Sequence, residues 1–125
     1  MKIRGTDFVV YQVSDLARAA AFYREVLGLR QTMFSKAWEW AEFDCGNVTL
    51  ALHGGNPPHL TCSGGRIALA VDNVVAAATE LKGKGVHISR EAQNYSVCWA
   101  AEVFDPDENA VILHQRADGT SGNQS

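Results

Sequence analysis

The sequence predicts an α+β protein built from two pseudo-symmetric β-α-β-β-β modules, which together form a curved mixed sheet with helices on its convex side. The main observation is a pattern that occurs twice: Trp, four residues, Phe-Asp, seven residues, Leu-His. It runs from Trp38 to His53 and again, 61 positions later, from Trp99 to His114. A weaker echo precedes each copy. Self-similarity at a fixed offset predicts that one supersecondary unit is used twice, with any site between the halves lined by matched positions.

The first module begins with a strand and a helix. Residues 7–13 are rich in the β-branched and aromatic side chains that are typical of strands. Apolar residues then recur at helical spacing from Leu16 to Leu27, after a cap at Ser14 or Asp15. Gly28 stands where a left-handed C-terminal cap is expected. Three strands should follow, at about residues 30–34, 37–45 and 48–52.

A single domain is expected over residues 1–116, with the first module at about 4–53 and the second at about 65–116. The linker at about 54–64 contains Gly54-Gly55 and Pro57-Pro58. The second module should repeat the order of the first, with a strand at 66–71, a helix at 73–82, and strands near 86–89, 97–104 and 110–115. The polar tail, 117–125, is expected to be disordered.

Charge and composition exclude several kinds of partner. Eleven basic and 14 acidic side chains give a formal charge of −3, without a basic run. This balance argues against nucleic acid and against anionic membranes. No apolar stretch reaches membrane-spanning length, so we expect a cytoplasmic protein whose partner is a small molecule. The three cysteines, Cys45, Cys62 and Cys98, suggest neither a disulfide frame nor a thiolate metal site, and we expect reduced thiols.

Three segments resemble one known family. They are VSDLARAAAFYREVLGL at 13–29, WAEFDCGNVTLALH at 40–53 and FDPDENAVILHQ at 104–115. All three are similar to the glyoxalase/bleomycin-resistance/dioxygenase (vicinal oxygen chelate) superfamily, and the resemblance covers nearly the whole chain. It implies a homodimer that is either a metal-dependent lyase, isomerase, epimerase, thiol transferase or dioxygenase, or a metal-free drug-binding protein.

The resemblance also implies where a metal would bind. Metal-dependent members use one ligand on the first strand and one on the last strand of each module, and these positions are Phe8, Ala51, Arg66 and Ile112 here. Phe, Ala and Ile carry no donor atom, and Arg stays protonated. We therefore expect no metal and no other cofactor. A relocated site that uses His53 and His114, the matched histidines of the repeat, remains an alternative.

Aromatic residues suggest the ligand instead. Strand alternation places Trp38, Trp40 and Glu42 on one face, and Phe43 on the other. The second module should place Trp99 opposite Phe104 in the same way. If Phe43 and Phe104 are core residues, Trp38 and Trp99 face the concave side as walls for a planar ligand. The alternative is that they fill the interior or contact a dimer partner.

The expected ligand site combines residues of both modules. Arg66 offers a charged end group for a ligand, or forms an internal ion pair with Glu42. The whole set is Phe8, Trp38, Trp40, Glu42, His53, Arg66, Trp99 and His114. The function it predicts is metal-free sequestration of an aromatic or amphipathic, antibiotic-like molecule. An enzyme of the superfamily, using a relocated metal or acid–base chemistry through Glu42, His53 or His114, is the alternative. An accessory domain without a ligand is a third.

Overall fold

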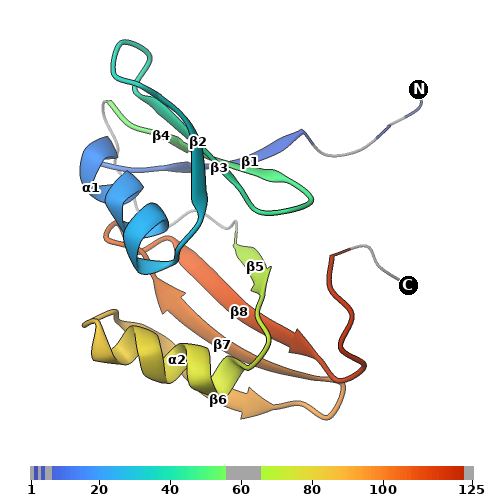
Figure 1. Ribbon diagram of the computed structural model, residues 1–125. Helices are drawn as coiled ribbons and strands as arrows, with labels where there is room; N and C mark the ends of the chain where they lie inside the picture. Colours follow the sequence, from blue (N-terminus) through green and yellow to red (C-terminus); the bar gives the residue numbers. More distant parts are fainter. Residues whose placement is uncertain (1, 3, 5–6, 56–65, 123–125) are drawn as a thin grey trace. The chain divides into compact units, whose positions relative to one another are not determined.

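The computed structural model describes the chain except for residues 1, 3, 5–6, 56–65 and 123–125. The chain divides into two compact units, Met1–His59 and Leu60–Ser125. Each unit holds one four-stranded mixed sheet, with the matching strand orders β1-β4-β3-β2 and β5-β8-β7-β6 (Figure 1). The first two sheet strands pair in parallel and the others pair antiparallel. The predicted α+β fold of two β-α-β-β-β modules is confirmed.

The first unit follows the predicted order of elements. Asp15 caps α1 by accepting a hydrogen bond from the Arg18 backbone N–H at 3.0 Å, as expected of a short acidic side chain at this position. The helix continues as a π-helical turn, η1, and Gly28 follows it with φ of 77°. The elements are β1 (Phe8–Gln12), α1 (Leu16–Ala21), η1 (Phe22–Val26), β2 (Arg30–Ser35), β3 (Trp40–Asp44) and β4 (Thr49–His53).

The second unit repeats this order. Asn73 caps α2 through a 2.9 Å hydrogen bond from the Ala76 backbone N–H. The strand after α2 is longer and begins later than the predicted 86–89, and it pairs with β7 across two irregularities in register. The elements are β5 (Ile67–Ala70), α2 (Val74–Gly83), β6 (Ile88–Asn94), β7 (Cys98–Phe104) and β8 (Ala110–Arg116).

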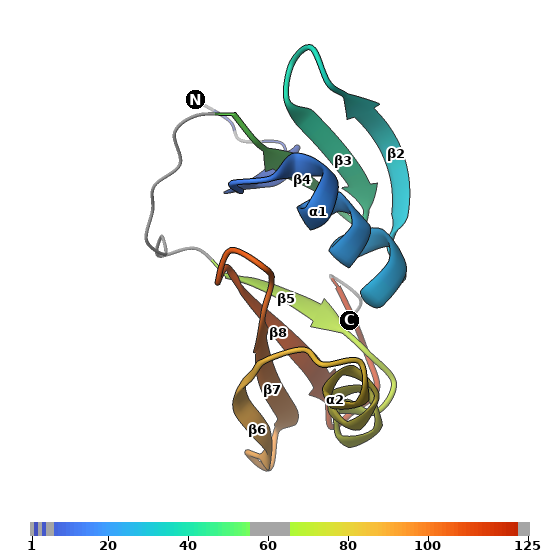
Figure 2. The same ribbon diagram turned by 90° about the vertical axis from the view of Figure 1, so that its left-hand side faces the viewer.

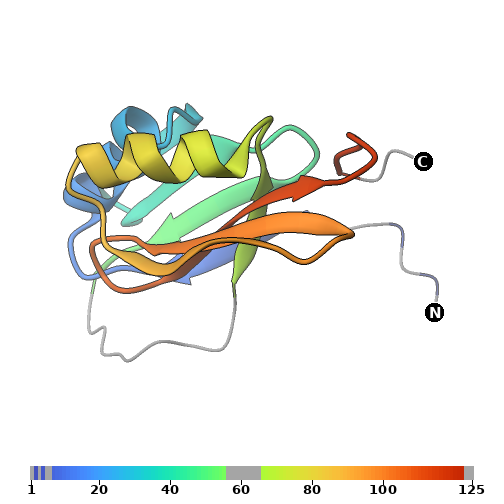
Figure 3. The same ribbon diagram turned by 90° about the horizontal axis from the view of Figure 1, so that it is seen from below.

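Each helix packs on one face of its own sheet and leaves the other face open (Figures 2 and 3). In the first unit, the ring of Tyr23 packs on Phe43 at a centroid distance of 5.9 Å, and both residues are buried. In the second, Ala101 and Val103 of β7 are buried. Because side chains alternate across a strand, the residues between these buried positions belong to the open face.

The strand registers align the two units residue by residue. His53 pairs with Trp40 and Gln12, and His114 pairs with Ala100 and Ala70, so the two histidines match as predicted. The third strands of the two sheets, β3 and β7, do not align in the way that the sequence repeat predicts. Trp40 corresponds to Ala100, and the offset there is 60 positions rather than 61.

The shift arises in the turn before the last strand. Four residues, 45–48, join β3 to β4, whereas five residues, 105–109, join β7 to β8. The longer turn is held by Asp105, whose carboxylate accepts hydrogen bonds from the backbone N–H groups of Asp107 and Asn109, both at 2.8 Å. Phe43 therefore corresponds to Val103, not to Phe104. Phe104 lies on the open-face side of β7, and its ring contacts His87 at 5.1 Å.

Two further parts of the chain bear on the predictions. Arg116, the last residue of β8, donates hydrogen bonds to Thr120 and to the Gly122 carbonyl, and the expected disorder of 117–125 stays a prediction. Most of the predicted linker lies outside the described residues, as does Cys62. No helix within the described ranges is long and apolar enough to cross a membrane.

Candidate ligand site

The open face of the first sheet is covered by its own side chains. The ring of Trp40, the first residue of β3, is in edge contact with Phe8 at a centroid distance of 5.7 Å and lies 5.7 Å from the ring of His53. Its indole Nε1 donates a 2.8 Å hydrogen bond to Glu42. His53 Nδ1 lies 2.8 Å from the side-chain oxygen of Gln12. These contacts leave Ala51, beneath them in β4, fully buried.

The open face of the second sheet carries a pocket of about 380 Å³. Ala100 stands where the first unit has Trp40, so no indole fills this space. Polar side chains border the pocket, and small or apolar residues of β7 and β8 form its floor. The lining residues are Arg66, Arg90, Tyr95, Cys98, Ala100, Ala101, Glu102, Ile112 and His114.

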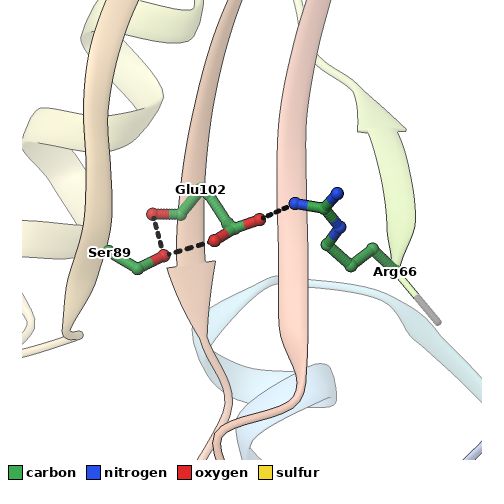
Figure 4. A network of polar contacts seen from close by, with 3 residues as sticks. All are labelled: Arg66, Ser89 and Glu102. Carbon is green, nitrogen blue, oxygen red and sulfur yellow. Dashed lines mark hydrogen bonds and ion pairs between the residues drawn. The ribbon is translucent and has the colours of Figure 1, made fainter. Parts of the chain in front are cut away.

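An ion pair crosses this face (Figure 4). Arg66 donates to Glu102 with a separation of 2.9 Å, and Ser89 Oγ lies 2.9 Å from the other carboxylate oxygen of Glu102. Ser89 Oγ is also 3.1 Å from the Glu102 carbonyl oxygen, so its single proton is shared between two acceptors. Burial raises the pKa of Glu102, but the hydrogen bonds from Arg66 and Ser89 outweigh it and hold the pKa below the ordinary value. Glu102 is therefore charged at neutral pH.

The structure corrects the expected partner of Arg66. The sequence suggested Glu42, but Glu42 accepts from Trp40 and the partner of Arg66 is Glu102. Glu102 is the register equivalent of Glu42, since each carboxylate stands opposite the corresponding residue of the last strand, Ala51 or Ile112. The 61-position repeat hid this match because it aligned Glu42 with Val103.

The two tryptophans of the repeat do not share a face. Trp38 lies in the turn 36–39 before β3, where Glu39 has a positive φ of 53°, and its side chain is 79% exposed. The predicted strand at 37–45 thus begins too early, and Trp38 is outside the sheet. Trp99 alternates with Ala100 along β7 and is not among the residues that line the pocket. The expectation that both face the concave side is wrong.

The remaining predicted site residues fall into two groups, one in each unit. Phe8, Trp40, Glu42 and His53 gather on the open face of the first sheet. Arg66 and His114 line the pocket of the second. Sequence reasoning missed Arg90, Tyr95, Cys98, Ala100, Ala101 and Glu102. For Cys98, Ala100 and Glu102 the signal was present in the alternation of β7, but it requires the correct register of the turn 105–109.

The donors at the family's metal positions do not fit a metal ion. Phe8 packs on Trp40, Ala51 is buried, Arg66 is bound to Glu102 and Ile112 forms part of the pocket floor. None of the four offers a lone pair to a cation. Among the described residues, no three His, Cys, Asp or Glu side chains form a group suited to a metal.

The fold and the sequence agree on the family. Residues 5–113 match the model of the Glyoxalase/Bleomycin resistance protein/Dioxygenase superfamily. The chain belongs to this superfamily.

Relatives within it differ in their described activities. The chain is 27% identical to a probable lactoylglutathione lyase of Vibrio parahaemolyticus, over 89% of this chain and 90% of that protein. It resembles the structure of TnmS3, an antibiotic binding protein from Streptomyces sp. CB03234, with a TM-score of 0.78, 24% identity, and coverage of 94% of this chain and 99% of that one. It also resembles lactoylglutathione lyase from Agrobacterium tumefaciens, with a TM-score of 0.73, 19% identity, and coverage of 91% and 95%. These two structural likenesses concern the fold.

Proposed function

We propose that this protein is a metal-free binding protein that captures an aromatic or amphipathic, antibiotic-like small molecule without changing it chemically. The observation that carries the proposal is the pocket of about 380 Å³ on the second sheet. Sites for small molecules typically enclose roughly 300–1,000 Å³ and combine apolar walls with a few polar groups. The floor of Ala100 and Ile112, bordered by Arg66, Arg90 and His114, has this composition.

The donor set supports a function without metal. The four family positions hold Phe8, Ala51, Arg66 and Ile112, whose chemistry does not suit a divalent ion. The fold is compatible with capture, since the antibiotic binding protein TnmS3 has a similar structure.

An enzyme is the second candidate, because the chain is 27% identical to a probable lactoylglutathione lyase. The proposed acid–base residues of the first unit are already engaged: Glu42 with Trp40, and His53 with Gln12. His114 is the better placed group, since it borders the pocket. Turnover of a bound ligand that is lost in a His114→Gln variant, with binding retained, would favour the enzyme.

Capture is tested with a variant whose side chain fills the pocket. Ala100→Trp introduces the side chain that the first unit has at the same register position, and we expect it to abolish binding while the fold is retained. Binding of a panel of planar aromatic molecules is measured by titration calorimetry, and the fold is followed by thermal melting. Val97→Trp is the matched control, because Val97 is 74% exposed and does not line the pocket. Equal affinities in Ala100→Trp and wild type would contradict a ligand site at this pocket.

The proposal includes two expectations from the sequence, a homodimer and a cytoplasmic location. A dimer of so small a chain is commonly symmetric. Light scattering at roughly tens of micromolar, a range suited to weak association, measures it. A monomer there would remove the dimer and leave the pocket untouched.

A further inference from the structure

Among the positions at which the open faces of the two sheets differ, three replace a large apolar side chain with an arginine or an alanine. Matched through the strand registers, each is large and apolar in the first unit and is either cationic or small in the second. The pairs are Phe8 and Arg66, Met33 and Arg90, and Trp40 and Ala100. The carboxylate and the histidine of each face are the same in both units. Compared with the first unit, the pocket therefore lacks an indole ring and has two additional guanidinium groups.

The charges around the pocket do not cancel. Arg66 and Arg90 contribute two positive charges and Glu102 contributes one negative charge. Glu102 is used by Arg66 and Ser89, with both of its oxygens engaged. Arg90 forms no hydrogen bond or ion pair with any residue in the described part of the chain, although its charge helps to lower the pKa of Glu102. One positive charge therefore borders the pocket in excess, although the whole chain carries −3.

Further donors face the same space. Only Nη1 of Arg66 is engaged by Glu102, so its other nitrogens keep donor capacity (Figure 4). The His114 ring forms no hydrogen bond within the ranges that the structure describes. A guanidinium group has five N–H donors in a planar fork and favours carboxylate or other oxyanion partners.

We propose that the pocket selects a flat apolar molecule that bears one acidic oxygen group, a carboxylate or a sulfonate, with the acidic group against Arg90 and the flat body over Ala100 and Ile112. This inference rests on the proposed function and adds the chemical class of the ligand. Glu102 affects which ligands bind, because its ion pair with Arg66 neutralises one of the two positive charges. The pocket then has a single excess positive charge. A neutral molecule of the same shape gains the apolar contacts but leaves Arg90 without a partner.

The test uses two probes with the same body. 8-Anilinonaphthalene-1-sulfonate and N-phenyl-1-naphthylamine share an anilinonaphthalene skeleton, and only the first carries a sulfonate. Both become fluorescent in apolar sites, so both are titrated into wild type and variants. Arg90→Met gives this position the residue of the first unit, and we expect it to weaken sulfonate binding about tenfold, as loss of one charged hydrogen bond does. The neutral probe should change less than about twofold, a shift within the few tenths of a kcal/mol of an exposed substitution.

Two more variants complete the design. Arg30→Met is the matched control, because it removes an exposed arginine from β2, the strand of the first unit that corresponds to β6. It should leave both probes unchanged. Glu102→Gln releases Arg66 and should strengthen sulfonate binding several-fold, about the effect of one freed charged donor, without changing the neutral probe. Thermal melting checks that each variant is folded.

The outcomes separate this inference from the proposed function. If both probes bind and Ala100→Trp removes both, while Arg90→Met affects them equally or not at all, the acidic ligand class is wrong and capture stands. If neither probe binds wild type, or if Ala100→Trp leaves binding intact, the anilinonaphthalene result counts against the pocket itself. Equal losses in Arg90→Met and Arg30→Met would overturn the role of Arg90.

Discussion

The two units have the same strand order and differ in what covers the open face of each sheet. In the first, Trp40 packs against Phe8 and His53 and donates a hydrogen bond to Glu42, so side chains of the sheet itself cover this part of the face. In the second, Ala100 leaves a pocket that Arg66 and Arg90 border. A repeated fold therefore does not imply a repeated site. One module can supply stability while the other keeps a space for a ligand.

The difference lies in a few side chains at matched register positions. Both faces keep a glutamate on the third strand and a histidine on the fourth, at matched registers. The glutamate pairs with an indole N–H in one unit and with a guanidinium in the other. The partner decides whether the carboxylate is part of a packed aromatic cluster or of a charged pocket rim.

The largest expected effect is on stability, in the first unit. Trp40→Ala removes an indole from a cluster of two rings and one carboxylate, and it should lower the free energy of unfolding by about 2–4 kcal/mol, near the lower part of the range for aromatic core truncation. Urea denaturation measures it. Trp38→Ala is the control, because its side chain is 79% exposed and its loss should cost within about 0.5 kcal/mol. Similar losses in both variants would contradict the packing role of Trp40.

A smaller effect is expected at the turn that separates the two registers. Asp105 is buried and its carboxylate accepts from Asp107, from the Asn109 backbone and from the Asn109 side chain. Asp105→Ala should cost about 1–3 kcal/mol of unfolding free energy, because it leaves buried donors unpaired. Asp105→Asn keeps one acceptor oxygen and should cost less. If Asp105→Ala melts as wild type does, the turn is not what fixes the register.

The ion pair of the pocket predicts a measurable pKa change. Arg66→Met should raise the pKa of Glu102, since burial opposes ionisation and only the hydrogen bond from Ser89 and the charge of Arg90 would still favour it. Ser89→Ala should raise it by less. Carboxyl NMR titration resolves both. A pKa that does not move in Arg66→Met would mean that the pair seen in Figure 4 does not persist in solution.

The sign of the associated stability change follows from linkage. The folded pKa of Glu102 is below its ordinary value of 4.5, so its contribution is fully present above pH 4.5 and is lost as the pH falls through the lowered pKa. Arg66→Met should therefore reduce the loss of stability on acidification in that window. The effect will be modest, because the Arg66 side chain is 54% exposed and solvent screens it.

The smallest effect is expected from metal removal. Because Phe8, Ala51, Arg66 and Ile112 offer no ligand, protein purified without a His-tag should contain sub-stoichiometric Ni, Zn, Mn and Fe, and chelator should leave the melting temperature unchanged. Elemental analysis and melting with chelator test this. One tightly held metal ion per chain would restore the enzyme alternative with a relocated site.

Much of the fold could be predicted from the sequence. Helical spacing after Asp15 and Asn73 and the matched positions of the two histidines are local patterns, and the structure has them where they were expected. The exact repeat of Phe-Asp and Leu-His was misleading, however. The spacing between Phe-Asp and Leu-His is the same in both copies of the repeat, but the turn 105–109 contains one residue more than the turn 45–48.

By itself, the sequence determined the fold class, the two modules, the superfamily and the absence of metal donors at four positions, because each depends on local pattern or on residue chemistry. Only the tertiary structure decided which side chains share a face. A shift of one residue in strand register exchanges the two faces of a strand, since side chains alternate with a period of two. That shift left Trp99 out of the pocket lining and brought Glu102 to Arg66. Strand pairing, a contact between distant segments, placed Ala100 on the floor of the pocket.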